Sequence, residues 1–347
     1  LATLSWLVRS EQGSRWLLQQ GLGLSPVTIE ASGISGTLAD GLGVDRLFIA
    51  LPVVEIHAGD IVFSWSPSRL LAGIVDINSA HIAELAIDIL ETESSDVPIE
   101  DKLFWLQIPL HINIESARLD RLRIGNTEFD NLDLAGTIGQ GQLEISSLAG
   151  QVDGIKLQAS GELEGPAPGR LRAIASWEMQ ADNLDGSGSF NGDIKTLAFE
   201  HVINVPETVN FSGTIHDLFS VPSLTGVAEW PSVRLPGETS LYSNNGKLNI
   251  HSDFLSAHLE GTSNMLLDSW PQAPLQIKAF ADLRGVRIDS YAIDVLDGHI
   301  TGSGRIDYSE GLQGQLMING TDIDTSMINA GLPGQLVFDA NLLIESM

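Results

Sequence analysis

The most regular feature of this chain is an alternation of apolar and polar residues. From Val27 onward, apolar residues recur at every second position, as in Ile112-Asn113-Ile114 and Leu143-Glu144-Ile145. Successive side chains of a β-strand point to opposite faces of a sheet, so this period of two predicts strands with one apolar and one polar face. Gly, Asn and Asp residues separate the runs, and helical signals are confined to short connectors at 67–73 and 324–329. We therefore predict an all-β body.

The residues before Val27 follow a helical pattern instead. Residues 1–8 are too short to cross a bilayer, which needs about 20 apolar residues. They are either the last turns of a membrane helix or part of a helix that caps the end of the β-body. The helical pattern continues to Gln20, and Gly21 and Gly23 follow it as breakers. We predict a membrane-proximal helix over 1–22 and a continuous β-groove over 23–347, a fragment that continues beyond its C-terminus.

Two stretches interrupt the alternation without ending it. One is the acidic segment 91–101, and the other is Gly165-Pro166-Ala167-Pro168-Gly169. The strand pattern is the same before and after each, so both are predicted as loops of one sheet. Segments 148–161 and 296–304 share a glycine turn, an alternating strand and a further glycine. This loose repetition indicates successive hairpins stacked along an axis.

Composition narrows the function classes. Of 347 residues, 43% are hydrophobic and 18% charged, which is typical of a folded chain rather than a disordered one. The absence of cysteine excludes disulfide frameworks, thiolate zinc sites and cysteine nucleophiles. With 45 acidic and 18 basic side chains the net charge is −27, and such a field repels phosphate backbones. We expect no nucleic-acid partner.

The sequence contains no constellation typical of catalysis. Its eight histidines form no H-x-x-x-H pair, and His251 and His258 are seven residues apart, which on one strand would place them on opposite faces. Asp322 and Asp324 form a D-x-D pair that lacks the rest of a calcium loop. Neither a G-x-S-x-G motif nor a P-loop occurs. We predict that the protein is not an enzyme and has neither a metal site nor a cofactor.

The apolar faces of so many strands require a cover. A helix layer is excluded because helices are nearly absent, which leaves a second sheet, a closed solenoid or a ligand. Irregular strand spacing and interspersed prolines disfavour the fixed rungs of a solenoid. A curled sheet with an apolar floor would hold acyl chains, and each buried methylene is worth about 0.8 kcal/mol. The residues predicted to line this groove are Ile112, Ile114, Leu122, Ile124, Leu132, Leu134, Leu143, Ile145, Ile155, Leu157, Leu248, Ile250, Leu316 and Ile318.

Several segments, in this order along the chain, resemble one protein family. They are Ser10–Leu18, Gly33–Leu38, Ile61–Gly73, Ile108–Glu115, Leu296–Gly298, Gly302–Tyr308, Met317–Gly320 and Leu332–Leu336. The resemblance is to the TamB members of the AsmA-like proteins of Gram-negative envelopes. It implies an elongated, twisted, open β-groove of repeating β-hairpins with a short N-terminal helix.

The resemblance also implies a function. Members are linked to phospholipid movement between the inner and outer membranes, and they are periplasmic with an anchor in the inner membrane. The expected partners are therefore phospholipids, the inner membrane through an anchor mostly absent from this chain, and a TamA-like outer-membrane barrel through a C-terminal region not present here. The alternative within the family is a scaffold or chaperone for outer-membrane protein assembly with that barrel. An alternative from another class of protein is a secreted β-solenoid enzyme or adhesin. Such a protein would differ from an open groove in having a closed, dry core.

Overall fold

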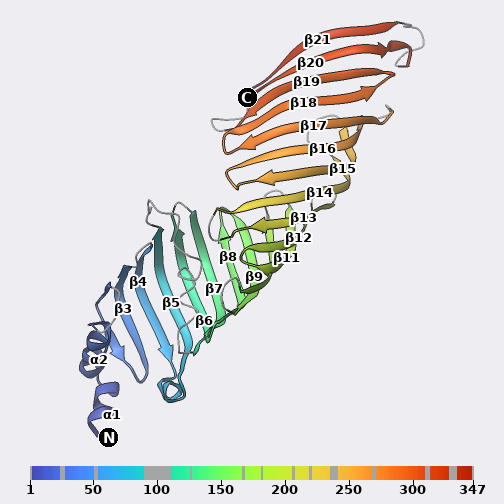
Figure 1. The fold of residues 1–347 in the computed structure, drawn as a ribbon. Coiled ribbons are helices and arrows are strands. Elements are labelled where there is room, and N and C mark those ends of the chain that lie inside the picture. Colours follow the sequence, from blue (N-terminus) through green and yellow to red (C-terminus); the bar gives the residue numbers. More distant parts are fainter. Residues whose placement is uncertain are drawn as a thin grey trace. The chain divides into compact units, whose positions relative to one another are not determined.

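The computed structural model describes residues 2–23, 28–50, 54–89, 111–125, 127–165, 169–180, 183–204, 208–218, 221–234, 241–267, 271–308, 313–327 and 334–345. Two helices open this part of the chain, α1 (Ala2–Arg9) and α2 (Glu11–Gly23), and 21 strands of one open sheet follow within the described residues (Figure 1). The predicted all-β fold with a short N-terminal helical segment is confirmed.

The strands are β1 (Thr28–Ser32), β2 (Ser35–Thr37), β3 (Gly41–Ala50), β4 (Val54–Trp65), β5 (Ile74–Ile89), β6 (His111–Ile124), β7 (Thr127–Gly139), β8 (Gln142–Val152), β9 (Ile155–Glu164), β10 (Arg170–Met179), β11 (Leu184–Asp193), β12 (Thr196–Asn204), β13 (Thr208–His216), β14 (Ser223–Arg234), β15 (Leu241–Ser252), β16 (Ser256–Leu267), β17 (Ala273–Asp282), β18 (Gly285–Val295), β19 (Gly298–Asp307), β20 (Gln313–Asp324) and β21 (Gln335–Glu345). Two 3-10 turns, η1 (Pro67–Ala72) and η3 (Thr325–Met327), occupy the two predicted connectors.

The chain divides into two compact units. Unit 1 comprises Leu1–Asn183 and Ser189–Asp193, and unit 2 comprises Leu184–Gly188 and Ile194–Met347, so strand β11 is shared between them. In unit 1, β1 and β2 both pair with β3, and the sheet then runs in chain order from β3 to β10. In unit 2 it runs in chain order from β12 to β21.

Most neighbouring strands are antiparallel, because short turns connect one strand to the next. Asp153-Gly154 joins β8 to β9 with φ values of 47° and 79°, and two consecutive positive φ values are typical of a type I′ hairpin turn. The exception is β5 with β6, which pair in parallel. Parallel neighbours need a long crossover connection, and here it spans residues 90–110, outside the described residues together with the predicted acidic loop 91–101.

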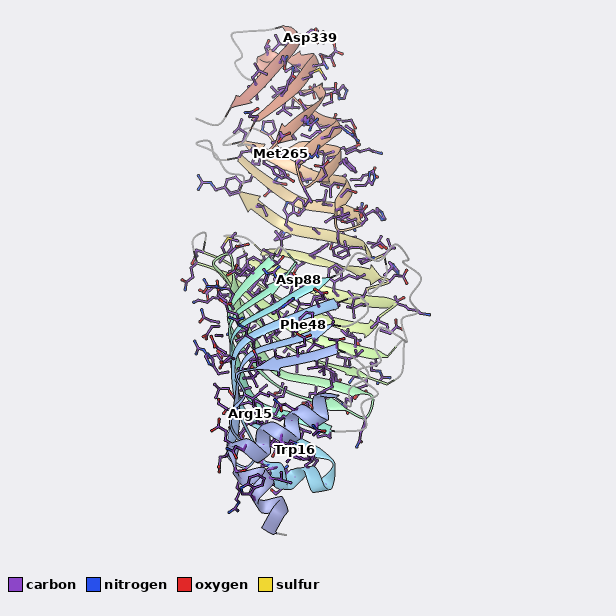
Figure 2. All side chains as sticks on the ribbon, turned by 90° about the vertical axis from the view of Figure 1, so that its left-hand side faces the viewer. Arg15, Trp16, Phe48, Asp88, Met265 and Asp339 are labelled. Atoms are coloured by element: carbon purple, nitrogen blue, oxygen red, sulfur yellow. The ribbon has the colours of Figure 1, made fainter. Side chains whose placement is uncertain are left out.

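The helices are held against the start of the sheet. Ser10 separates α1 from α2, and its Oγ accepts a hydrogen bond from the Gly13 amide at 3.1 Å, as an N-cap does. The Arg15 guanidinium of α2 donates to the Ile34 carbonyl at 2.8 Å; Arg15 and Trp16 are labelled in Figure 2. No helix among the described residues is both long and apolar enough to span a bilayer. The predicted division into residues 1–22 and 23–347 stays a prediction.

Candidate functional site

Apolar side chains lie side by side across the strands of unit 1. Directly paired residues of neighbouring strands share a face of the sheet, so the register defines rows that cross several strands. One such row crosses β1, β3, β4, β5 and β6 and consists of Ile29, Ile49, Ile56, Ile87 and Ile124. A second crosses β5 to β10 and consists of Val75, Ile112, Ile138, Leu143, Leu163 and Leu171. The rows form an apolar face.

The other predicted residues of unit 1 join this face in neighbouring rows. Ile114 and Ile145 flank Gly136, and Leu122 lies between Leu85 and Phe129. Their remaining register partners are Leu119 for Leu132, Leu148 for Leu134, Val152 for Ile155 and Trp177 for Leu157.

The four predicted residues of unit 2 lie on a corresponding face there. Ile250 and Leu316 belong to a row across β15 to β21 that consists of Ile250, Leu259, Ala279, Ile288, Gly304, Leu316 and Leu342. Leu248 and Ile318 belong to the next row, which includes Ile277 and Tyr291.

Glycines let large side chains lie flat on the apolar face of unit 2. A Cβ added to Gly261 would lie 2.8 Å from Cδ1 of Leu248, and one added to Gly302 would lie 2.5 Å from the Tyr291 hydroxyl. Leu248 therefore covers its neighbouring strand instead of standing away from it. These side chains therefore lie close to the sheet at the two positions where the neighbouring strand supplies a glycine, Gly261 and Gly302.

The exposure of the predicted residues shows that no second layer of the described residues covers the apolar face. Of the fourteen predicted residues, thirteen are half-buried, and only Leu132 is buried, at 8% exposure. Side chains packed between two layers would be buried throughout. The side chains of both faces are drawn in Figure 2.

Two ionisable side chains sit on this face in unit 2, and both are shifted toward their neutral forms. Burial lowers the pKa of His201, which is the register partner of Phe211. Burial also raises the pKa of Tyr291, whose hydroxyl donates to the Met317 carbonyl at 3.3 Å. Desolvation disfavours the charged form of either group, so the face stays uncharged at these positions.

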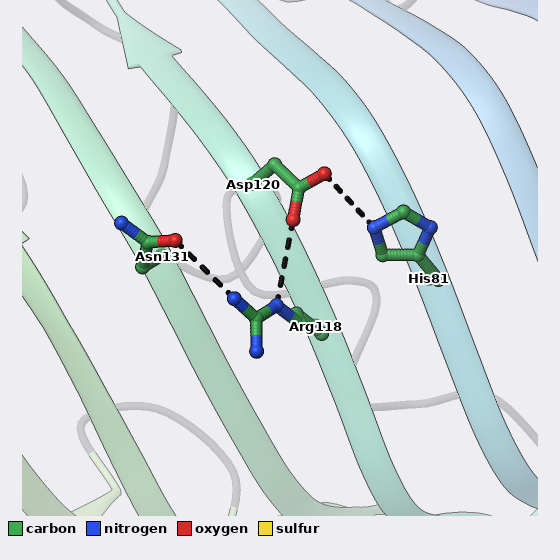
Figure 3. Close-up of polar contacts among 4 residues, drawn as sticks. All are labelled: His81, Arg118, Asp120 and Asn131. Carbon is green, nitrogen blue, oxygen red and sulfur yellow. Dashed lines mark hydrogen bonds and ion pairs between the residues drawn. The ribbon is translucent and has the colours of Figure 1, made fainter.

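The opposite face of unit 1 is polar and carries ion pairs across strands. Arg121 of β6 contacts Glu84 at 3.2 Å and Glu128 at 2.8 Å. On the same face, Figure 3 shows Asp120 between His81, at 3.0 Å, and Arg118, at 3.4 Å. The Arg118 guanidinium also donates to Asn131 at 3.3 Å (Figure 3). The hydrogen bond from His81 is the main cause that lowers the pKa of Asp120.

A hollow of about 520 Å³ also opens on the polar face, across β1, β3, β4 and β5. Glu30, Arg46 and Glu84 line it together with Phe48 and His57, whose ring centroids are 4.8 Å apart. Its charged lining differs from the apolar rows, so it is not the predicted groove.

The structure changes two sequence-based expectations about faces. Strand β6 does not alternate strictly: its less exposed positions are residues 111–114, Ala117, Leu119, Leu122 and Ile124. A strict alternation counted from Ile112 therefore misses Ala117 and Leu119. The sequence does carry a signal for this change of face, because two polar residues follow one another at Glu115-Ser116 and again at Asp120-Arg121. The expectation that His251 and His258 lie on opposite faces is wrong, because Asp253 begins a turn and the two histidines are direct partners on β15 and β16.

Neither face presents a metal-binding cluster. Among the described residues, no group of three or more His, Asp or Glu side chains is placed to hold an ion. Each buried side-chain nitrogen or oxygen of that part of the chain has a hydrogen-bond partner. In each unit, the feature that stands out is the apolar face formed by the register rows.

Comparison with protein families shows that residues 92–341 match the N-terminal domain of TamB. The matched region covers more than two thirds of the chain and includes all fourteen predicted residues. Comparisons with curated proteins and with solved structures gave no match.

Proposed function

Because the chain belongs to the TamB family, whose members serve transport and assembly in the Gram-negative envelope, we propose that it conducts phospholipids between the inner and outer membranes along its apolar face. The observation that supports this most directly is the continuity of the apolar rows. Acyl chains would lie on the rows and remain out of water, while headgroups stay in solvent at the open side.

The proposal gives the chain a passive role. The rows of apolar side chains along the described strands supply a surface for acyl chains, and in this proposal the free energy that sets the direction of transport comes from elsewhere. Proteins of the TamB family are periplasmic and anchored in the inner membrane. For this chain, an anchor that precedes α1 and a TamA-like partner are part of the proposal.

The first measurement is native mass spectrometry with lipid extraction, on the protein purified from an envelope fraction in mild detergent. We expect several phospholipids per chain, because each unit offers more than one row of apolar side chains. A lipid-free chain of stable mass would contradict the proposal and favour apolar faces that cover one another.

A charge on the apolar face should then block the path. Ile114→Asp and Leu157→Asp place a carboxylate among the apolar rows, and we expect each to lower the number of bound lipids while circular dichroism keeps its β signal. Ile174→Asp is the matched control, because Ile174 is 61% exposed and lies beside Arg172 on the polar side of β10. Equal lipid loss in the control, or unfolding of both test variants, would count against an open conduit.

A further inference from the structure

The eight histidines of the chain are divided unequally between the two faces of the sheet. His201 of β12 lies on the apolar face of unit 2, because its register partner is Phe211 and it alternates with the exposed Glu200. Each of the others is next in sequence to an isoleucine or leucine of the apolar face, and alternation therefore turns it to the polar face. These seven are His57, His81, His111, His216, His251, His258 and His299.

The imidazole of His201 is part of a row that crosses most of unit 2. From β12 to β20 the row consists of His201, Phe211, Ala228, Leu248, Gly261, Ile277, Tyr291, Gly302 and Ile318. A Cβ added to Gly188 would lie 2.5 Å from Nδ1 of His201, so the imidazole covers the backbone of β11 at this position. An acyl chain that follows the row must therefore pass over the imidazole.

The surroundings of this imidazole on its own face are apolar. Its neighbours there along β12 are Phe199 and Ile203, and the ring centroid of Phe199 is 4.8 Å from that of Phe211. Phe199 is 6% exposed, and His201 is half-buried beside it. Burial lowers the pKa of His201 from its ordinary value of 6.5, so the side chain is neutral at pH 7.5.

The titratable groups of the adjacent strands point elsewhere. In the described part of β11 to β13 and their turns they are Asp185, Asp193, Lys195, Glu200, His216 and Asp217. Glu200 is exposed on the opposite face, and Asp185 accepts a hydrogen bond from Asn204 at 2.6 Å. The remaining four are the last residues of a strand or follow its end. No charge of these strands is therefore placed on the apolar face beside His201 to favour its protonated form.

Histidine is the side chain whose charge ordinarily changes between pH 5 and pH 8. The other ionisable group of the row is Tyr291, and burial raises its pKa above the ordinary value of 10.0, so Tyr291 stays neutral throughout this range. An acyl chain laid over an imidazolium ion removes water from the charge, and this desolvation is unfavourable. Covering the neutral imidazole has a much smaller cost.

We propose that His201 makes lipid binding to the apolar face of unit 2 dependent on pH. The neutral imidazole accepts an acyl chain above it, and the imidazolium ion excludes the chain. This inference rests on the proposed function and adds a means of regulation to the same surface.

The direction of the effect follows from proton linkage. An acyl chain buries His201 further, so the pKa of the imidazole is lower in the lipid-loaded protein than in the empty one, and binding releases a proton. The affinity is therefore complete above pH 6.5 and falls as pH decreases through the pKa of the empty protein.

The test measures the affinity of the protein for phosphatidylcholine with a pyrene-labelled acyl chain, at pH 7.5 and at pH 5. The choline headgroup keeps its charge over this range, so the lipid does not titrate. We expect binding about three- to tenfold weaker at pH 5 for the unmodified protein. His201→Phe should bind equally at both pH values. His251→Phe, which removes an exposed histidine of the polar face, should retain the loss at pH 5.

A second variant and a second measurement keep the test decisive if His201→Phe lowers the melting temperature. His201→Gln is uncharged at both pH values and should also bind equally. In NMR spectra of the unmodified protein, the imidazole signal that is missing from His201→Gln should titrate at lower pH after lipid is added, while the other seven signals keep their midpoints.

The outcomes separate this inference from the proposed function. Absence of lipid binding at pH 7.5 would overturn both. Binding at pH 7.5 with equal affinity at pH 5, or a loss at pH 5 that persists in both His201 variants, would overturn the pH dependence through His201 and leave the conduit standing. Tighter binding at pH 5 that disappears in His201→Gln would also overturn it, because the imidazolium would then attract the lipid phosphate.

Discussion

Single residues decide how closely the N-terminal helices approach the sheet. Gly13 allows the crossing of α1 and α2, because a Cβ there would lie 2.6 Å from the Leu7 backbone. Ser14 is fully buried beside it, and its Oγ accepts from the Leu38 amide at 2.8 Å. The Leu38 carbonyl in turn accepts from the Trp65 indole at 2.7 Å. The sequence motif Gly13-Ser14-Arg15 is thus explained by packing and backbone hydrogen bonds.

Removing the Ser14 hydroxyl should loosen this attachment. We expect Ser14→Ala to lower the free energy of unfolding by about 1–3 kcal/mol, the cost of a buried amide left without its partner. Hydrogen exchange at the Leu38 amide should become faster in the same variant. Ser68→Ala, at an exposed serine of η1, should change stability by less than about 0.5 kcal/mol. Unchanged exchange at Leu38 would mean that another group replaces the hydroxyl.

The elements were predictable from the sequence where local chemistry alone determines them. Alternation predicts the strands, and the hairpin at 148–161 follows from Asp153-Gly154. Two features depend on pairing that a strand's own residues do not encode: the parallel contact of β5 with β6, and the change of inward positions along β6. Asn131 on the neighbouring β7 has a φ of 51°, and this kink lies opposite the exposed Asp120 of β6. Within each unit the predicted groove residues share a face, but the predicted set is incomplete because it lacks Ala117 and Leu119.

The β15–β16 hairpin should respond to pH through Asp253. Hydrogen bonds from Ser256 and Leu255 lower the pKa of this carboxyl from its ordinary value of 3.8. A lowered folded-state pKa means that the carboxylate stabilises the hairpin above pH 3.8 and that this stabilisation disappears as pH falls through the folded-state value.

Asp253→Asn provides the comparison that isolates this effect. Its melting temperature should lie below that of the unmodified protein by a constant amount between about pH 7 and pH 5, and the gap should close below pH 3.8. Asp120 and Asp324, whose pKa values are also lowered, titrate in both proteins. Their contributions to the melting temperature therefore cancel in the difference between the two proteins. A gap that already changes between pH 7 and pH 5 would show that a group other than Asp253 is responsible.

At the scale of the whole chain, stability should be local to each unit, because strands pair with neighbours in the sequence within β3–β10 and within β12–β21. Such a sheet resembles repeat proteins, in which stability is a sum of units and nearest-neighbour contacts.

Gly302→Val tests whether stability is local, since a side chain there would clash with the Met317 carbonyl and the Tyr291 ring. We expect faster hydrogen exchange in β18, β19 and β20, and unchanged exchange in β6 to β9. The conservative substitution Ile318→Val, in the same row, should have a smaller effect in the same strands. Loss of protection in unit 1 as well would mean that the two units unfold together as one cooperative sheet, and a charge placed in either unit would then disturb lipid binding in both.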